Sequence, residues 1–380
     1  MPEFYEFFAG GGMARAGLGP AWTCRFANDF DERKAAVYSL NWGAAGLKAG
    51  DVATVSPEEL PGRADLAWAS FPCQDLSLAG AQAGLRGERS GTFFSFWRLM
   101  QRLAAEGRGP RIIALENVCG ALTSHGGRDF RAICEAFLDL GYKCGALVID
   151  AALFVPQSRP RLFLVGVADD VAIPASLTAR APVEPFHPAT LRRAVETLPA
   201  DIAEQLTWWA PPPPARRNSA FADLIEDDPS KGSWHTPAQT ERLLSLMSPL
   251  HRRRVEDATA AGERRVGAVY RRTRQDAEGR KVQRAEVRFD EVSGCLRTPA
   301  GGSSRQQILV VEGGNVRSRL LSPREAARLM GLPDDYRLPR GATEAYHLLG
   351  DGVAVDVVRH LARHLFQPLL GIAKAARSAA

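Results

Sequence analysis

The chain has 380 residues, of which 45% are hydrophobic and 24% are charged, and its formal net charge is +5. A chain of this length and composition can bury an ordinary hydrophobic core, and we expect two domains of unequal size. It contains no uncharged apolar stretch of the roughly 18 to 20 residues that a membrane span needs, and no N-terminal leader pattern. We therefore expect a cytoplasmic protein with no membrane partner.

The six cysteines are scattered along the chain. They lack the paired spacing of zinc ligands and are too sparse for a disulfide scaffold. We expect reduced thiols and no metal site.

Short apolar runs alternate with helical patterns in the N-terminal part of the chain. This alternation is typical of βαβ units, and it predicts an α/β fold built on a parallel sheet. The strands are expected at residues 4–8, 64–69, 112–115 and 162–165, and helices at 94–103 and 129–140.

The chain between residues 175 and 315 is rich in Pro and Arg and has few periodic segments. Residues 251–320 contain 16 Lys and Arg against 9 Asp and Glu, a local excess of +7. This excess suits a surface that faces phosphate groups; a solvated polar face is the alternative interpretation. Further on, a capping box predicts a helix over 322–330, and apolar residues at four-residue spacing predict another over 353–365.

A cluster of glycines follows the first expected strand. Gly10, Gly11 and Gly12 lie where this strand turns into a helical segment, so a nucleotide-like ligand can approach the backbone closely. The GxGxxG dinucleotide fingerprint is not met, because Arg15 holds the place of its last glycine. A purely structural turn is the alternative interpretation.

Two acidic residues follow the glycines. Asp29 comes 19 residues after Gly10 and is suited to accept hydrogen bonds from ribose hydroxyl groups. Asp51, after Gly50, is suited to bind an adenine amino group. Capping of a helix is the alternative role for either carboxylate.

Three kinds of reactive side chain are expected at one edge of the sheet. Cys73 follows the second strand and Glu116 ends the third, while Arg159 and Arg161 lie at the start of the fourth. Ligands of open parallel sheets bind outside the carboxyl ends of the strands, so a thiol, a carboxyl and guanidinium groups there form a candidate catalytic set. The glycine-rich segment 75–91 is predicted to close over a substrate. For Cys73 alone, buried packing is the alternative.

With these motifs in family order, the chain resembles the bacterial-type DNA (cytosine-5)-methyltransferase family. The resemblance covers roughly residues 1–170 and 315–365. It is carried by Phe8-Ala9-Gly10, Phe71-Pro72-Cys73-Gln74, Glu116-Asn117-Val118, Gln157-Ser158-Arg159-Pro160-Arg161, the segment from Leu321 to Pro333, and Gly350-Asp351-Gly352-Val353.

The resemblance implies a Rossmann-like methyltransferase sheet that binds S-adenosylmethionine, together with a second, smaller target-recognition domain. The catalytic and cofactor-binding domain would begin with residues 1–172, the target-recognition domain would span 173–315, and residues 316–380 would return to the catalytic domain. The partner would be double-stranded DNA. We expect a monomer associated with a bacterial nucleoid, with a separately encoded restriction endonuclease as a candidate partner.

The implied activity is sequence-specific methylation of cytosine C5 in DNA. Cys73 would add to C6 of a cytosine flipped from the duplex, and Glu116 would hold N3. Arg159, with Arg161 beside it, would stabilise charge on the carbonyl side of the ring. The implied cofactor residues are Phe8, Ala9, Gly10, Gly11, Gly12, Asp29, Phe30, Asp51, Val52, Pro72, Asp351 and Val353, and the implied DNA-binding residues are Gln74, Ser77, Arg297, Ser303, Ser304, Arg305 and Gln306.

The chain departs from the family pattern at three places. Glu6 stands where the family usually has Asp, and Met13 follows Gly12 where a further Gly is common. Asp351 replaces the usual Asn, which adds a carboxylate near the expected methionine portion of the cofactor. None of these changes removes a group of the catalytic set.

Three other functions compete with this interpretation. A transfer RNA cytosine C5-methyltransferase uses the same framework, but that branch usually has a short variable region, whereas this one is long and basic. A catalytically silent DNA-binding homologue would not need the Cys-Glu-Arg set. A small-molecule methyltransferase or a nicotinamide enzyme would explain only the glycine turn.

Overall fold

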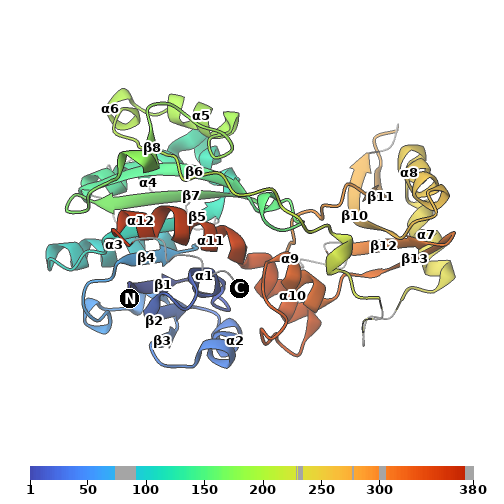
Figure 1. The fold of residues 1–380 in the computed structure, drawn as a ribbon, viewed down its shortest axis with the longest axis horizontal. Helices are drawn as coiled ribbons and strands as arrows, with labels where there is room; N and C mark the ends of the chain where they lie inside the picture. Colours follow the sequence, from blue (N-terminus) through green and yellow to red (C-terminus); the bar gives the residue numbers. More distant parts are fainter. Residues whose placement is uncertain (73–90, 228, 230–233, 276–277, 299–304, 373–380) are drawn as a thin grey trace. The chain divides into compact units, whose positions relative to one another are not determined.

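The computed structural model describes residues 1–72, 91–227, 229, 234–275, 278–298 and 305–372. The chain folds into two compact units (Figure 1). The first unit consists of Met1–Asp150, Pro160–Ala215 and Val353–Ala380, and the second of Ala151–Arg159 and Arg216–Gly352.

A seven-stranded sheet forms the centre of the first unit, in the order β3-β2-β1-β4-β5-β7-β6. The first five strands in this order run parallel to one another, whereas β7 runs antiparallel to both β5 and β6. The strands are β1 (Glu3–Phe7), β2 (Thr23–Asp29), β3 (Leu47–Ala49), β4 (Leu66–Ala69), β5 (Ile112–Val118), β6 (Tyr142–Asp150) and β7 (Pro160–Ala168).

The four strands expected from the apolar runs are all present, as β1, β4, β5 and β7. The predicted α/β fold on a parallel sheet is confirmed, and β7 is the one described strand of this sheet that runs antiparallel to both of its neighbours. This strand follows β6 after only the connection 151–159, which has no crossover helix. A parallel return needs a connection of a dozen or more residues, so the two neighbouring strands form an antiparallel pair.

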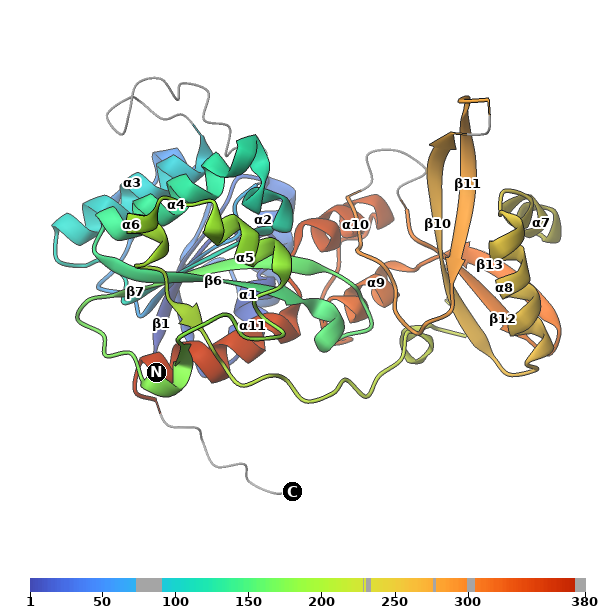
Figure 2. The same cartoon turned by 90° about the horizontal axis from the view of Figure 1, so that it is seen from above.

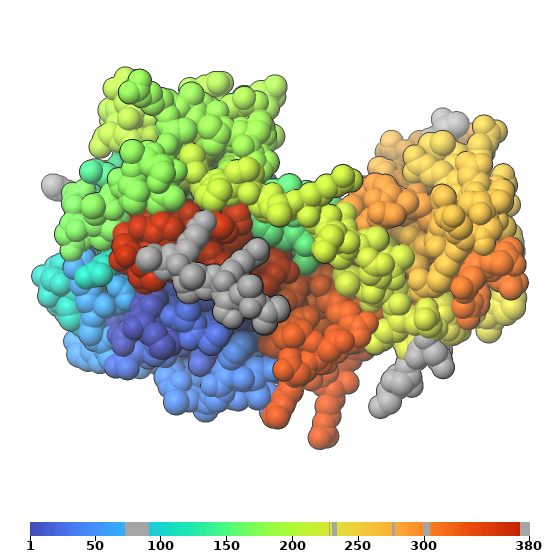
Figure 3. All heavy atoms as spheres, viewed as in Figure 1, coloured from blue at the N-terminus to red at the C-terminus, as the bar shows by residue number. Residues whose placement is uncertain are grey.

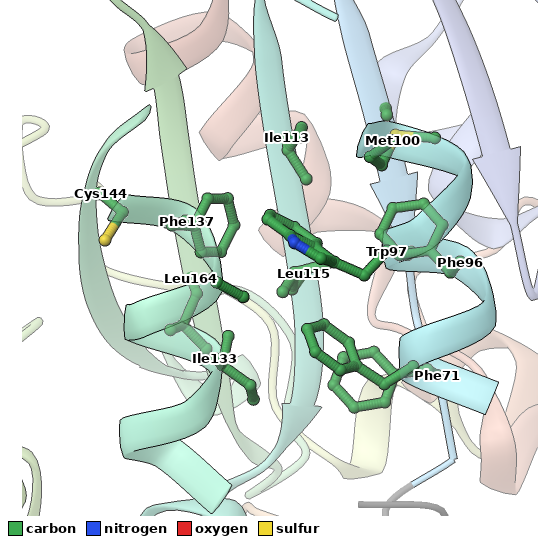
Figure 4. Packing of buried hydrophobic residues seen from close by; sticks show 14 of the residues in the cluster. Phe71, Phe96, Trp97, Met100, Ile113, Leu115, Ile133, Phe137, Cys144 and Leu164 are labelled. Carbon is green, nitrogen blue, oxygen red and sulfur yellow. The ribbon is translucent and has the colours of Figure 1, made fainter. Parts of the chain in front are cut away.

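Two amphipathic helices cover one face of this sheet. They are α3 (Thr92–Ala105) and α4 (Arg128–Asp139), close to the two helices predicted between the strands. Trp97 of α3 packs edge-on against Phe137 of α4 above Ile113 and Leu115 of β5 (Figure 4). Burial of these large side chains is the main stabilising term on this face.

The C-terminal segment covers the other face of the sheet. Figure 2 shows α1 (Met13–Leu18) and α11 (Val355–Leu361) on the side of the sheet opposite α3 and α4. The two helices pack closely at Gly17, where an added Cβ would lie 2.4 Å from Cβ of Val358. In Figure 3 this last segment lies between the N-terminal strands and residues after 160. The C-terminal helix α11 therefore packs against α1, the helix that follows the glycine cluster.

The remaining elements of the first unit pack around the sheet. Trp209 is fully buried and donates from Nε1 to Val165 O at 3.1 Å, which ties residues near 209 to β7. These elements are α2 (Glu32–Trp42), β8 (Thr178–Ala179), α5 (Ala189–Glu196), α6 (Ala200–Ala203), β9 (Trp208–Trp209) and α12 (Gln367–Leu369).

The second unit contains a four-stranded antiparallel sheet in the order β11-β10-β12-β13. Two helices, α7 and α8, contribute Leu243, Val255 and Ala258 to a small core against one face of this sheet. The elements are α7 (Pro237–Ser245), α8 (Pro249–Ala260), β10 (Arg265–Gln275), β11 (Lys281–Arg288), β12 (Gln307–Glu312), β13 (Asn315–Leu320), α9 (Pro323–Leu329) and α10 (Ala342–Asp351).

The boundaries of the two compact units differ from the expected domain boundaries. Residues 173–215 belong to the first unit because Trp209 and β8–β9 pack beside the large sheet. Residues 316–352 belong to the second unit because β13 pairs with β12. The predicted capping box is present, since Ser322 and Glu325 cap each other's backbone at the start of α9.

Within the described ranges, no helix has both the length and the apolar composition to cross a membrane. The same residues contain no group of three or more His, Cys, Asp or Glu that could hold a metal ion.

Candidate active site

The strand order of the large sheet reverses at β1, which has β2 on one side and β4 on the other. In open α/β sheets, ligands bind in the crevice outside the carboxyl ends of the strands at such a point. The glycine loop follows β1, Phe71 and Pro72 follow β4, and Glu116 lies near the end of β5. The topology therefore brings three of the sequence motifs to one edge.

The glycine loop is a sharp turn with an unusual backbone. Phe8, directly after β1, has a φ of 57°, and Gly10 and Gly12 have φ values of 55° and 79°. Non-glycine residues seldom adopt positive φ, so Phe8 is held there by its surroundings. An added Cβ at Gly12 would lie 2.3 Å from Nε1 of Trp42, whereas one at Gly10 would meet no heavy atom within 4 Å. Open space therefore lies over Gly10.

Asp29 fixes the position of this loop. Its Oδ2 accepts a hydrogen bond from Gly10 N at 2.7 Å, and its Oδ1 accepts one from Asp31 N at 2.9 Å. Asp29 is buried, and this burial raises the pKa of its carboxyl group. The next residue, Phe30, is 75% exposed, so its aromatic ring is open to stack on a ligand. The carboxylate thus supports the loop backbone, and its predicted contact with ribose remains a prediction.

Asp51 and its neighbour have different environments. Oδ1 of Asp51 accepts from Ala53 N at 2.9 Å and caps a short helical turn, so the alternative role of a helix cap is observed. Val52 is buried. The adenine contact predicted for Asp51 remains a prediction.

The last predicted cofactor motif falls at a boundary between the compact units. Val353 is buried in the first unit, just before α11. Asp351 is exposed in the second unit, where its Oδ1 accepts from Thr298 Oγ1 at 3.2 Å. The carboxylate that replaces the family's Asn therefore has a partner within its own unit.

The predicted nucleophile Cys73 lies outside the described residues, as do Gln74 and Ser77. The two residues before it are described. Phe71 is buried among the aromatic side chains beside α3, and Pro72 is exposed. Nδ2 of Asn117 donates to Phe71 O at 3.1 Å, and its Oδ1 accepts from Val118 N at 2.8 Å. Asn117 thereby ties the backbone just before Cys73 to the end of β5, a role that the sequence interpretation missed.

Glu116 and Arg161 form an ion pair at the same edge. Arg161 Nε lies 3.2 Å from Glu116 Oε1, and the two side chains are 14% and 6% exposed. The pair exists because β7 is antiparallel to β5, with Arg161 opposite Val118 and Phe163 opposite Glu116. Residues of such a pair that lie diagonally across the two strands share a face and are within reach of long side chains. A carboxyl and a guanidinium group are therefore held together near the backbone that leads to Cys73.

Arg159, the other arginine of the motif, has a different environment. It is buried in the second unit, where Nη1 donates to Leu296 O at 3.0 Å and Nη2 donates to Gly350 O and Gly352 O, both at 2.7 Å. Gln157 is also buried there, and its Oε1 accepts from Leu296 N at 3.0 Å. These contacts hold two backbone segments together, so these hydrogen bonds of Arg159 are structural. Its predicted contact with the base remains a prediction.

The described residues of the predicted DNA-reading loop are partly held by the protein itself. Arg297 is exposed. Arg305 Nη2 donates to Thr343 Oγ1 at 2.8 Å, and Gln306 Nε2 donates to two backbone carbonyl groups, Val269 O and Gln307 O, each at 3.1 Å. Ser303 and Ser304 lie outside the described residues. The contact of this loop with bases remains a prediction.

Glu6 and Arg15 form a buried network below the glycine loop. Glu6 is 1% exposed, and its Oε1 accepts from Arg15 N at 3.2 Å. The Arg15 side chain donates to Tyr38 OH at 3.0 Å and lies over the ring of Trp42, whose Nε1 donates to Gly11 O at 3.0 Å. Arg15, which occupies the position of the last glycine of the dinucleotide fingerprint, thus helps to hold the glycine loop in place.

Burial raises the pKa of Glu6 to about 8, against smaller opposing effects of the Arg15 backbone and side chain and of the Tyr38 hydroxyl group. The carboxyl group is therefore largely protonated in the folded protein at neutral pH.

Comparison with known proteins shows the family of the chain. The sequence pattern of the C-5 cytosine-specific DNA methylase family matches residues 3–367, and the chain belongs to this family. A similar curated protein is the type II methyltransferase M.BsuFI of Bacillus subtilis, 26% identical over 97% of this chain and 73% of its own length. Another is the type II methyltransferase M.HhaI of Haemophilus parahaemolyticus, 24% identical over 96% of this chain and 94% of its own length.

Solved structures support the fold. The Dnmt2 methyltransferase of S. pombe superposes with a TM-score of 0.58 at 16% identity, over 97% of this chain and 99% of that chain. A putative DNA modification methyltransferase encoded within an E. coli prophage superposes with a TM-score of 0.56 at 16% identity, over 98% of this chain and 100% of that chain. The expected methyltransferase sheet with a separate second domain is confirmed.

The first prediction concerns the pH dependence of stability at Glu6. The folded carboxyl group keeps its proton up to about pH 8, whereas the unfolded one loses it near its ordinary pKa of 4.5. Between these values the folded state binds more protons, so the contribution of Glu6 to the free energy of unfolding falls as pH rises. Glu6→Gln keeps an oxygen acceptor for Arg15 N and cannot ionise. Its melting temperature relative to wild type should therefore rise from about pH 5 to about pH 8.

This difference is measured by thermal melts of both proteins across that range. Glu204→Gln removes an exposed carboxylate and controls for the change in net charge. A difference between Glu6→Gln and wild type that stays constant with pH would show that Glu6 is ionised in the fold.

Proposed function

We propose that the protein is a sequence-specific DNA cytosine C5-methyltransferase that uses S-adenosylmethionine and converts cytosine in duplex DNA to 5-methylcytosine. The observation that carries the proposal is the Glu116–Arg161 pair, at 3.2 Å, on the sheet edge to which Asn117 ties the backbone before Cys73. Membership of the C-5 cytosine-specific DNA methylase family and the likeness to bacterial type II methyltransferases support the same activity.

The residues near the glycine loop fit S-adenosylmethionine. The turn leaves open space over Gly10, the exposed ring of Phe30 offers a surface for adenine, and Asp29 stands beside both. We assign the remaining cofactor contacts to Asp51, Val52, Pro72 and the Gly350–Val353 motif by resemblance to the family. When bound, this cofactor would supply a methyl group that is activated by its positively charged sulfur.

The protein's own side chains would make the cytosine reactive. C5 of cytosine is a poor nucleophile, but a thiolate added at C6 turns C5 into the nucleophilic end of an enamine. Cys73 would supply the thiolate. Electron density moves into the ring as sulfur adds, so a hydrogen bond or proton from Glu116 to N3, given by its carboxyl group in the protonated form, lowers the barrier. We assign charge stabilisation on the carbonyl side to Arg161, because it is the arginine that contacts Glu116.

The reaction would end with loss of the C5 proton and expulsion of the Cys73 sulfur, which restores the aromatic ring. We assign none of the described side chains as the base that removes the C5 proton. We propose that an ordered water molecule accepts this proton. C6 is inaccessible within a stacked base pair, so the cytosine must leave the duplex at a cost of a few kcal/mol. Asn117, which holds the backbone before Cys73, would position the nucleophile for the extruded base.

The second unit would recognise the target. Its basic excess suits phosphate contacts, which position a protein on DNA without reading sequence. We propose that the protein acts as a monomer in a bacterial cell. Because the relatives are named type II methyltransferases, a separately encoded restriction endonuclease is a candidate partner.

The second prediction tests the substrate. Purified protein is incubated with tritiated S-adenosylmethionine and either duplex DNA of random sequence or transfer RNA. We expect the tritiated methyl group on C5 of cytosine in DNA, and none in transfer RNA. Incorporation into transfer RNA alone would establish the alternative RNA methyltransferase, and cofactor and DNA binding without any transfer would establish the silent homologue.

The third prediction separates the two arginines of the motif. Arg161→Lys removes the planar guanidinium group beside Glu116, and turnover on DNA should fall about 100-fold with little change in melting temperature. Arg159→Lys leaves backbone carbonyl groups of the second unit without their donors, and stability should fall by roughly 3 kcal/mol. Single-turnover rates and thermal melts of both variants measure these effects. The opposite pattern would return the base contact to Arg159.

A further inference from the structure

The strands β10 and β11 form a two-stranded ribbon that is longer than the helices packed on it. They pair continuously from Ala268 opposite Arg288 to Gln275 opposite Lys281. Side chains alternate between the two faces of the ribbon. One face contributes Val269, Ala285 and Val287 to the core against α7 and α8, and Figure 2 shows the ribbon continuing past both helices.

The same face continues beyond this core with polar side chains only. Register places Thr273 opposite Gln283 and Gln275 opposite Lys281, while Arg271 lies opposite Ala285. The five polar side chains are exposed, and we call them the ribbon face: Arg271, Thr273, Gln275, Lys281 and Gln283.

Both faces of the ribbon are basic, but only one of them carries a carboxylate. On the face opposite the ribbon face, Arg272 and Arg274 both pair with Glu286, at 3.4 and 2.5 Å, and Arg284 is exposed across from Arg272. The ribbon face has two cationic side chains and, within the fully described strands β10 and β11, no carboxylate. Gln283 Nε2 donates to Thr273 Oγ1 at 2.8 Å, which orders these two side chains across the strands.

We propose that the ribbon face enters the major groove of the target DNA and reads base edges there. This inference rests on the proposed function, and it names the surface that determines sequence preference. Arginine is suited to O6 and N7 of guanine, and glutamine to N6 and N7 of adenine; the threonine methyl group is suited to the methyl group of thymine. The ribbon face presents all three residue types on one ordered surface.

The dimensions of the ribbon suit this groove. Two paired strands lie about 4.8 Å apart, and the major groove is about 12 Å wide and admits a two-stranded ribbon. From Arg271 to Gln275 the strand rises about 13 Å, which corresponds to about four base pairs at 3.4 Å each. The described part of the ribbon face is therefore long enough to read a short site.

The predicted DNA-reading loop is less suited to this role in its described part. The amide nitrogen of Gln306 already donates to two backbone carbonyl groups, and Arg305 is bound to Thr343. On the ribbon face, by contrast, Arg271 and Lys281 make no ion pair with any described residue. Gln283 donates one amide hydrogen to Thr273 and keeps its second one for a base, whereas Gln306 uses its amide nitrogen for two backbone carbonyl groups.

The fourth prediction compares two neighbouring arginines that carry equal charge on opposite faces. Wild type, Arg271→Ala, Gln283→Ala and the control Arg272→Ala are each allowed to methylate a library of random duplexes, and the methylated contexts are sequenced. Arg271→Ala and Gln283→Ala should lower methylation at the preferred site by about 10-fold or more and broaden the preference at one position each. Arg272→Ala should keep the ranking of contexts.

Thermal melts confirm that each variant is folded, and DNA affinity is measured as a function of salt. If Arg271→Ala weakens binding equally for all sequences and lowers the salt slope by about 1, the residue contacts phosphate and base reading is overturned. An unchanged context preference in both ribbon variants also overturns it. Wild type that methylates no DNA would instead refute the proposed function.

Discussion

The antiparallel pairing of β7 with β5 is the constraint on which the site depends. It places Arg161, the second residue of β7, opposite Val118 at the carboxyl end of β5. From there the Nε atom of Arg161 lies 3.2 Å from Oε1 of Glu116. In a parallel sheet the start of β7 would lie at the other edge, about 20 Å away along the strand. The reversal of one strand therefore assembles the carboxyl–guanidinium pair.

This constraint also divides the Gln-Ser-Arg-Pro-Arg motif between two tasks. Arg161 belongs to the large sheet and points to Glu116, whereas Arg159 is two residues earlier and is buried in the second unit. Arg159 satisfies three backbone carbonyl groups from segments far apart in sequence. One motif thus supplies Arg161, to which we assign a role in the chemistry, and Arg159, which organises the backbone.

Much of this arrangement was predictable from the sequence. Apolar runs gave four strands of the large sheet, and the glycines, Glu116 and Arg161 follow or begin these strands as expected. The direction of β7 was not predicted, because no strand was expected at Tyr142–Asp150, where β6 lies. Without β6, the short connection that makes β7 antiparallel cannot be inferred from the sequence. Apolar runs report burial, whereas strand direction depends on the connection between neighbours.

Other features depend on contacts that no local pattern reports. Asn117 was part of a recognised motif, but its hydrogen bond to Phe71 O joins residues 46 positions apart. The sequence shows only that Arg15 stands where the GxGxxG fingerprint has its last glycine. In the structure its guanidinium group lies over the ring of Trp42, which donates to Gly11 O. The ribbon face could not be predicted, because beyond Ala285 both faces of the two strands are mostly polar and show no alternation of apolar and polar residues. Only the strand register shows which side chains share a face.

The account rests on a thiolate of Cys73 that attacks cytosine held by Glu116 and Arg161. It is tested most directly by incubating the protein with S-adenosylmethionine and duplex DNA in which 5-fluorocytosine replaces the target base. Fluorine at C5 cannot leave as a proton does, so the intermediate should persist as a covalent complex, and peptide mapping should place the DNA on Cys73. A protein that methylates ordinary DNA but forms no adduct, or forms it at another residue, would contradict the account.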